Sequence, residues 1–261
     1  MHDHGPILHR AASLAACALA IAAAGAQTPT QPQTPPPPAQ AGGEAADGLR
    51  KVLQVYAAAK TYQATWSYSL TKGEEVQKMN LEVRAKPPSR LSFRVMPAPG
   101  GKTAKGSKET PLPEMTVNID GTTACFVNAG ESVYFQVPFP AGSRIAPLHF
   151  FPQIPDASDV KRLPDATVAG KAYVVLEARR ADGSVARIEI DPAILRIKRI
   201  VQESMVGLNR VTSVLMVEKE VFDAEIPDAK FAYKPPKGYK EVPAPAESGA
   251  LFAPPAPAAP K

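Results

Sequence analysis

The feature that most constrains the fold is a change of hydrophobic period at Lys60. Before this residue, Leu49, Val52 and Tyr56 recur at three- and four-residue spacing, and charged residues fall on the other side. This pattern is typical of one amphipathic helix. After Lys60, apolar and polar residues alternate, which is typical of a strand with one buried and one solvated face. The sequence therefore predicts a single helix followed by strands.

The period of two continues along most of the chain. We expect strands at residues 61–70, 79–83, 91–95, 115–119, 122–127, 132–137, 171–179, 185–190, 195–202 and 211–220. Asp120-Gly121 indicates a tight hairpin, and the less regular residues 139–164 are expected to hold a short helix and a surface lid. One helix and a long antiparallel meander predict a mainly β (α+β) fold, in which a strongly bent sheet wraps around the helix.

The first 26 residues have the form of a secretory signal peptide. An apolar run at residues 11–24 follows Arg10, and Ala24-Gly25-Ala26 is a small-x-small cleavage site that predicts a mature start at Gln27. The run is too short to favour a membrane span. The segment ending at Cys17 also fits a lipobox, so a lipid anchor at Cys17 is an alternative to soluble export.

The remaining chain divides by composition into three parts. Residues 27–43 are rich in proline and glutamine and predict an extended, disordered linker. Residues 44–242 are expected to form one domain, since no second linker interrupts them. Residues 243–261 are an Ala/Pro-rich tail that is expected to be disordered.

Composition argues against several classes of function. The formal charge of +5 is unchanged by signal removal, which takes away Asp3 and Arg10, and it is too small and dispersed to predict a nucleic-acid partner. The mature chain keeps one cysteine, Cys125, and one histidine, His149. We therefore expect no internal disulfide and no zinc site.

The same counts argue against catalysis. His149 is the one histidine available to a Ser-His or Cys-His pair, and it lies in an apolar run. Asp156 and Asp159 are interpreted as capping or loop residues, and no glycine-rich phosphate loop follows a strand. The sequence predicts a protein that is not an enzyme and has no cofactor, with carboxylate pairs from distant strands left open.

The informative set of residues is apolar. Its members project from successive strands onto one face of the predicted sheet: Tyr62, Trp66, Tyr68, Leu81, Leu91, Phe93, Val117, Ile119, Phe126 and Phe135. They are either the core beneath the helix or the lining of an apolar cavity for an acyl chain. The basic residues in 196–199 are interpreted as a solvated strand face, with contact to lipid phosphates as the alternative.

Several segments together resemble a known family. They are Lys86-Pro87-Pro88-Ser89-Arg90-Leu91, then Asp120-Gly121-Thr122, and the ending formed by residues 221–228 and by the run from Phe231 to Tyr239. In this order they resemble the periplasmic lipoprotein carrier LolA and its superfamily, and in particular its branch of uncharacterised predicted periplasmic proteins. The resemblance spans roughly residues 45–242.

The resemblance implies an incomplete antiparallel β-barrel with a helical lid over an apolar cavity. It further implies a periplasmic monomer that binds a lipid or lipoprotein acyl chain, with a membrane-bound donor or acceptor protein as a further partner. One position departs from the family, because Pro87 stands where the Lys-Arg-Pro motif has an arginine that takes part in lid movement. A protein-interaction or sensor module with a collapsed cavity is the alternative function.

Overall fold

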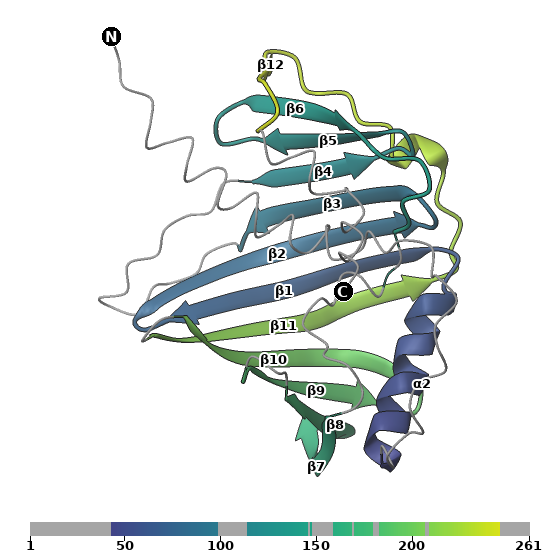
Figure 1. Cartoon of the computed structure of the whole chain (residues 1–261), viewed down its shortest axis with the longest axis vertical. Helices are drawn as coiled ribbons and strands as arrows, with labels where there is room; N and C mark the ends of the chain where they lie inside the picture. Colours follow the sequence, from purple (N-terminus) through teal and green to yellow (C-terminus); the bar gives the residue numbers. More distant parts are fainter. Residues whose placement is uncertain are drawn as a thin grey trace, which may run out of the picture.

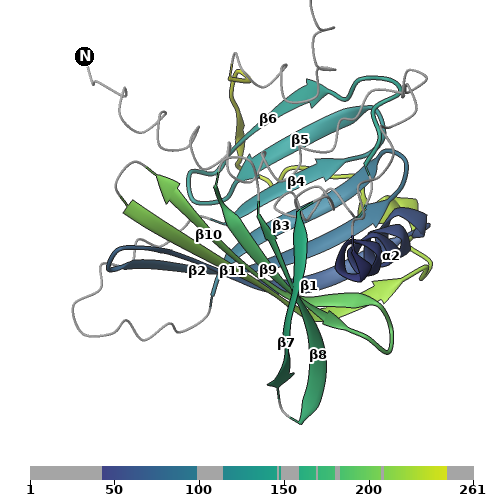
Figure 2. The same cartoon turned by 60° about the horizontal axis from the view of Figure 1, so that its bottom comes forward.

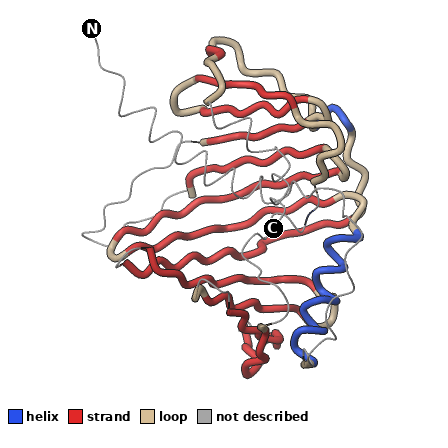
Figure 3. The backbone as a smooth tube through the Cα atoms, viewed as in Figure 1, coloured by secondary structure: helices blue, strands red, loops and turns tan. Residues whose placement is uncertain are grey.

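The computed structural model describes residues 43–98, 114–145, 147, 159–168, 170–179, 183–206 and 209–245. This part of the chain forms one α-helix, one short 3-10 helix and a single sheet (Figures 1 and 3). Their bounds are α2 Glu44–Ala58, β1 Tyr62–Lys72, β2 Glu75–Lys86, β3 Arg90–Pro97, β4 Met115–Ile119, β5 Thr123–Asn128, β6 Val133–Pro138, β7 Val160–Val168, β8 Lys171–Arg179, β9 Val185–Asp191, β10 Arg196–Val206, β11 Asn209–Phe222, η2 Asp228–Lys230 and β12 Lys240–Glu241.

The sheet has twelve strands in the order β12-β6-β5-β4-β3-β2-β1-β11-β10-β9-β8-β7. Neighbouring strands are antiparallel except β12, which pairs in parallel with β6. The central pair, β1 and β11, joins the beginning and the end of the meander. The sheet is strongly bent (Figure 2) and its two outermost strands do not pair with each other, so the expected incomplete barrel is confirmed.

Helix α2 covers one side of the concave face, which we call the inner face. It lies against β7 and β10 and runs alongside the ends of β8 to β11 (Figure 1). Ala46, Leu49, Val52 and Tyr56 are its buried residues, as the three- and four-residue spacing predicts. The helix thus shields the β7–β11 side of the sheet from solvent.

The inner face carries continuous rows of side chains that cross the strands. One row follows the register from β6 to β11: Phe135, Phe126, Val117, Phe93, Val83, Ala64 and Glu220. Adjacent strands lie about 4.8 Å apart, so six spacings give this row a length of about 29 Å along the sheet. A bilayer core of about 30 Å holds two acyl chains end to end, so the row is longer than one acyl chain.

The last described part of the chain crosses back over the sheet. Residues 223–242, which we call the strap, leave the end of β11 and reach β6, where Lys240 N donates to Ser132 O over 3.0 Å. Ile226 and Phe231 are buried in the strap. Asp228 binds Lys86 and Arg90 at the two ends of the β2–β3 turn. The strap therefore fastens the β2–β6 side of the sheet from outside.

Two strands were not predicted from the sequence. β7 falls partly in the expected lid region, and its side chains are largely exposed and interrupted by Pro164, so no period of two marks it. Its register with β8 also shifts between Leu163 and Ala166. β12 has two residues and pairs with a strand about a hundred residues away in sequence, which a local pattern cannot show.

Several predictions fall outside the described residues. They are the signal peptide with Cys17, the linker except Gly43, the tail beyond residue 245, His149, Asp156 and most of the expected lid and its short helix. The strands at 61–70 and 115–119 and the Asp120-Gly121 hairpin are present as expected. In that turn, Asp120 Oδ1 accepts hydrogen bonds from the amides of Thr122 and Thr123, both over 2.9 Å.

Candidate functional site: the inner face of the sheet

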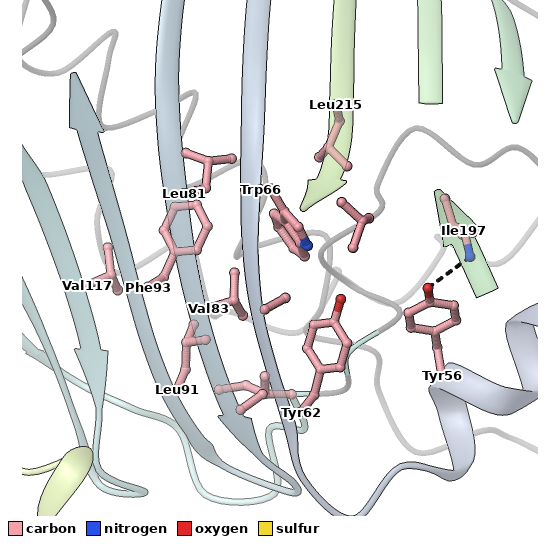
Figure 4. Close-up of a cluster of buried hydrophobic side chains, with 14 of the residues drawn as sticks. Tyr56, Tyr62, Trp66, Leu81, Val83, Leu91, Phe93, Val117, Ile197 and Leu215 are labelled. Atoms are coloured by element: carbon pink, nitrogen blue, oxygen red, sulfur yellow. Dashed lines mark hydrogen bonds between the residues drawn. The ribbon is translucent and has the colours of Figure 1, made fainter. Parts of the chain in front are cut away.

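The structure places the ten predicted site residues on one face. Eight of them are buried: Tyr62, Trp66, Leu81, Leu91, Phe93, Val117, Ile119 and Phe126. Tyr68 and Phe135 are partly buried and pack against the same cluster. Figure 4 shows how Trp66, Leu81 and Phe93 converge from neighbouring strands. The alternation in the sequence thus identified a shared face correctly, and the described structure has these side chains in its core.

The two partly exposed members lie at different places on this face. Phe135 is on β6, next to the edge of the sheet, and stacks on Phe126 with ring centroids 4.7 Å apart. Tyr68 lies opposite Met79 and Leu215 in the half of β1 farther from α2's last turn. These two positions are the least covered members of the predicted set.

A β-bulge brings a carboxylate onto the same face. Between Thr65 and Trp66 the register with β11 shifts, so that Ala64 lies opposite Glu220 and Trp66 opposite Val217. A bulge adds one residue to one strand and thereby changes which side chains point inward. Glu220 therefore shares the inner face with Val217 and Phe222, and its side chain is 9% exposed.

Glu220 joins three elements of the fold. The hydroxyl of Tyr56, in the last turn of α2, donates to Glu220 Oε2 over 3.1 Å, and the hydroxyl of Tyr62 on β1 donates to the same oxygen over 3.2 Å. Tyr56 also accepts a hydrogen bond from the backbone N–H of Ile197 on β10 over 3.1 Å (Figure 4). Arg196 Nε lies 3.9 Å from Glu220 Oε1. We call Tyr56, Tyr62, Arg196 and Glu220 the Glu220 cluster.

Burial dominates the electrostatics of this cluster. Desolvation raises the pKa of Glu220 above its ordinary value of 4.5, although the hydrogen bonds from Tyr56 and Tyr62 and the charge of Arg196 act in the opposite direction. Burial also raises the pKa values of Tyr56 and Tyr62, because a phenolate loses its hydration there, and the charge of Glu220 raises them further. Both phenols therefore stay protonated and remain hydrogen-bond donors at neutral pH.

The interpretation of residues 196–199 as a solvated face is wrong for Arg196. Its guanidinium lies over the Phe222 ring, 4.3 Å from the centroid, and beside Glu220. Lys198 donates to the carbonyl of Val217, and Arg199 pairs with Glu189 over 3.0 Å. The register shift between Ile197 and Arg199 changes the side to which these residues point, so simple alternation could not place them.

Sequence reasoning also missed Glu220 and the polar role of Tyr56. Tyr56 was recognised as a member of the apolar helix face, and no local pattern relates it to a residue 164 positions away. Glu220 gives no local signal either, since it follows Glu218 and Lys219 in a charged stretch of the strand. A buried carboxylate needs hydrogen-bond partners, which the two tyrosines supply.

A separate depression of about 180 Å³ lies on the opposite, outer face. It borders the β-bulge. Its lining comes from β1, β2 and β11: Gln63, Ala64, Thr65, Glu82, Val83, Arg84, Lys219 and Val221. Three of its lining residues, Glu82, Arg84 and Lys219, are charged, which does not suit an alkyl chain. The depression is therefore distinct from the predicted apolar site.

Other chemistry in the described residues is limited. No group of three or more His, Cys, Asp and Glu side chains there is arranged to hold a metal ion. Cys125 is buried on β5, and burial raises the pKa of its thiol, which disfavours the reactive thiolate. Within these same residues, no helix combines the length and the apolar character needed to cross a membrane.

Comparison with known proteins finds similarity in structure. No family model and no curated protein matches the chain. An uncharacterised conserved protein from Thermus thermophilus matches with 14% identity and a TM-score of 0.45, over 76% of this chain and 99% of that one. LprF from Mycobacterium bovis matches with 11% identity and a TM-score of 0.40, over 70% and 95% of the two chains. The LolA superfamily protein NE2245 from Nitrosomonas europaea matches with 12% identity and a TM-score of 0.33, over 72% and 97%.

Proposed function

We propose that this chain is an exported, non-enzymatic carrier or binding protein that holds an apolar ligand against the inner face of its sheet. The ligand class is a lipid or lipoprotein acyl chain, and the compartment is the periplasm. The observation that carries the proposal is the continuous row of apolar side chains from Phe135 to Ala64, which crosses six strands. The sequence resemblance to LolA and the signal-peptide pattern support the same function.

The affinity would come from burial of alkyl surface. Each methylene group that leaves water contributes about 0.8 kcal/mol, so a chain of ten buried methylenes gains about 8 kcal/mol before the costs of ordering. Most of the row is buried in the structure, so uptake requires the side chains to be uncovered or displaced. Entry near Tyr68 or Phe135 would need the smallest displacement, because both are already partly exposed.

The proposal is tested by uptake of a fluorescent alkyl-chain probe by the delipidated protein. Phe135→Glu places a charge at the partly exposed end of the row and should lower probe affinity at least tenfold, because a charge in an apolar site is costly. Gln136→Glu is the matched control, since Gln136 is the adjacent, exposed residue of the same strand and alternates to the outer face. It should leave uptake unchanged.

Two outcomes would change the proposal. If the wild-type protein takes up neither alkyl probes nor an acylated peptide, the carrier function falls and a protein-interaction or sensor module becomes the leading candidate. If Phe135→Glu and Gln136→Glu weaken uptake equally, the probe does not bind on the inner face. Circular dichroism of both variants separates loss of binding from loss of the fold.

A further inference from the structure

The Glu220 carboxylate is an unusual group to find beneath a helix. It lies at the end of an apolar row, and its hydrogen-bond donors come from two separate elements, α2 and β1. Tyr56 binds both this carboxylate and the backbone of β10 through one hydroxyl group. Through this hydroxyl group, the last turn of α2 is attached to both β10 and β11.

The charge of this carboxylate is incompletely compensated. Arg196 is near, but its Nε is 3.9 Å from Glu220 Oε1, beyond hydrogen-bond length, and its guanidinium also rests on Phe222. Lys198 lies close enough to act on Glu220 through its charge, but its ammonium donates to a backbone carbonyl. The groups that face Glu220 are thus Tyr56 from α2, Tyr62 from β1, and Arg196 and Lys198 from β10. Two neutral donors and two cations at longer range stabilise an ionised carboxylate less than water does.

We propose that Glu220 is a proton-operated latch for α2: the neutral carboxyl holds the last turn of the helix against β10 and β11, and the ionised carboxylate loosens it. A neutral carboxyl group still accepts a hydrogen bond from a tyrosine hydroxyl through its carbonyl oxygen. Its own O–H group is an additional hydrogen-bond donor. An ionised carboxylate draws water, and displacement of the last turn of α2, which carries Tyr56, would uncover it further. The pKa of Glu220 is raised in the folded protein, so the stabilisation is present at low pH and is lost as the pH rises, as this mechanism requires.

The chain near the latch restricts the movement to a pivot. The segment between α2 and β1 is tied to the end of β11 independently of Glu220, because Lys60 N donates to Asp223 Oδ1 over 2.7 Å and Thr61 Oγ1 donates to Ala224 O over 2.6 Å. Ionisation of Glu220 therefore loosens α2 without detaching its end. The helix would tilt away from the inner face, and the apolar surface under it would become accessible.

The sequence provides a direct probe for the experiment. Trp66 is the one tryptophan of the chain, is fully buried, and its ring lies 6.4 Å from that of Tyr62. We would record tryptophan emission and acrylamide quenching of the ligand-free full-length mature protein from pH 4.5 to 8. The wild-type emission should shift to longer wavelength and quenching should rise as the pH rises. Glu220→Gln should keep the low-pH values throughout.

Two further variants make the result specific. Glu218→Gln removes the same charge from an exposed position two residues away, which binds Ser67, and should keep the wild-type pH response. Tyr62→Phe removes one donor to the ionised carboxylate and should move the midpoint of the transition to higher pH. Asp228 titrates below its ordinary value of 3.8 and the two buried tyrosines titrate above 10, so none of them contributes in this range.

The latch is disproved if the wild-type emission does not change with pH, or if Glu220→Gln changes with pH as the wild type does. Should Glu220→Gln fail to fold, the Tyr62→Phe midpoint decides, and an unchanged or lower midpoint overturns the proposal. The experiment contains no ligand, so its failure leaves the binding proposal intact, and a failure of probe uptake leaves the latch intact.

Discussion

Helix α2 and the strap are each attached to the sheet through a carboxyl group, and the pKa values of these two groups are shifted in opposite directions. On the β7–β11 side, α2 covers the inner face and is attached by Glu220, whose side chain is 9% exposed. On the β2–β6 side, the strap is attached by Asp228, whose side chain is 58% exposed and pairs with Lys86 and Arg90. Burial raises the pKa of Glu220, whereas hydrogen bonds from Lys86 and Arg90 lower the pKa of Asp228. The same chemical group therefore responds to acid in opposite directions in the two places.

The difference shows how exposure to solvent changes the preferred charge state of a carboxyl group. Around Asp228, water and two cations stabilise the charged form, so the contact is an ordinary surface ion pair of small net value. Around Glu220, removal of water costs more than two tyrosine hydroxyls return, so the neutral form is preferred. Acid should strengthen the attachment of α2 and weaken that of the strap. The comparison leads to three further predictions.

The largest effect is expected at Trp66, which lies where the two sides meet. Trp66 is fully buried between Leu81 on β2 and Val217 on β11. Trp66→Ala should lower the free energy of unfolding by about 3–5 kcal/mol, because it leaves a cavity that the sheet cannot close. Urea denaturation followed by circular dichroism measures this change. A loss below about 1 kcal/mol would show that Trp66 lines open space and would assign it to a ligand cavity.

A smaller effect is expected from the helix attachment. Tyr56→Phe removes the donor to Glu220 and leaves the Ile197 N–H without its acceptor, so the free energy of unfolding should fall by about 1–3 kcal/mol. Tyr134→Phe is the control, since its hydroxyl binds Glu241 at an exposed position, and it should cost less than about 0.5 kcal/mol. Equal losses in chemical denaturation would contradict a special role for the buried side.

The smallest effect is expected at the strap. The pKa of Asp228 is lowered in the folded protein, so its contribution to stability is present above its ordinary value of 3.8 and is lost as the pH falls through the lower, folded value. Asp228→Asn should therefore flatten the acid side of the stability profile: its small loss of stability is greatest at pH 7 and disappears below the folded pKa of Asp228. Thermal unfolding of both proteins between pH 2 and pH 7 provides the measurement. An acid limb that is identical in the variant would mean that the strap is held by Ile226 and Phe231 alone.

The sequence by itself determined the class of fold and the membership of the inner face. Alternation placed Leu81, Phe93 and Val117 on one side, because a strand with one solvated face must keep its apolar side chains on the other. It also determined the helix, because the spacing of Leu49, Val52 and Tyr56 fits one face of a helix and no strand. Both properties are local in the chain, so they can be predicted without tertiary structure.

Tertiary structure alone decided where the alternation of the strands is interrupted and which side chains come together there. The bulge opposite Thr65 turns Glu220 inward, and Arg196 lies beside it from the neighbouring strand β10. Tyr56 reaches the same carboxylate from a helix 164 residues earlier. Strand pairing and helix docking depend on contacts between distant segments, and a one-residue shift reverses which side chains face inward. A polar cluster built from such contacts leaves no periodic signal in the sequence.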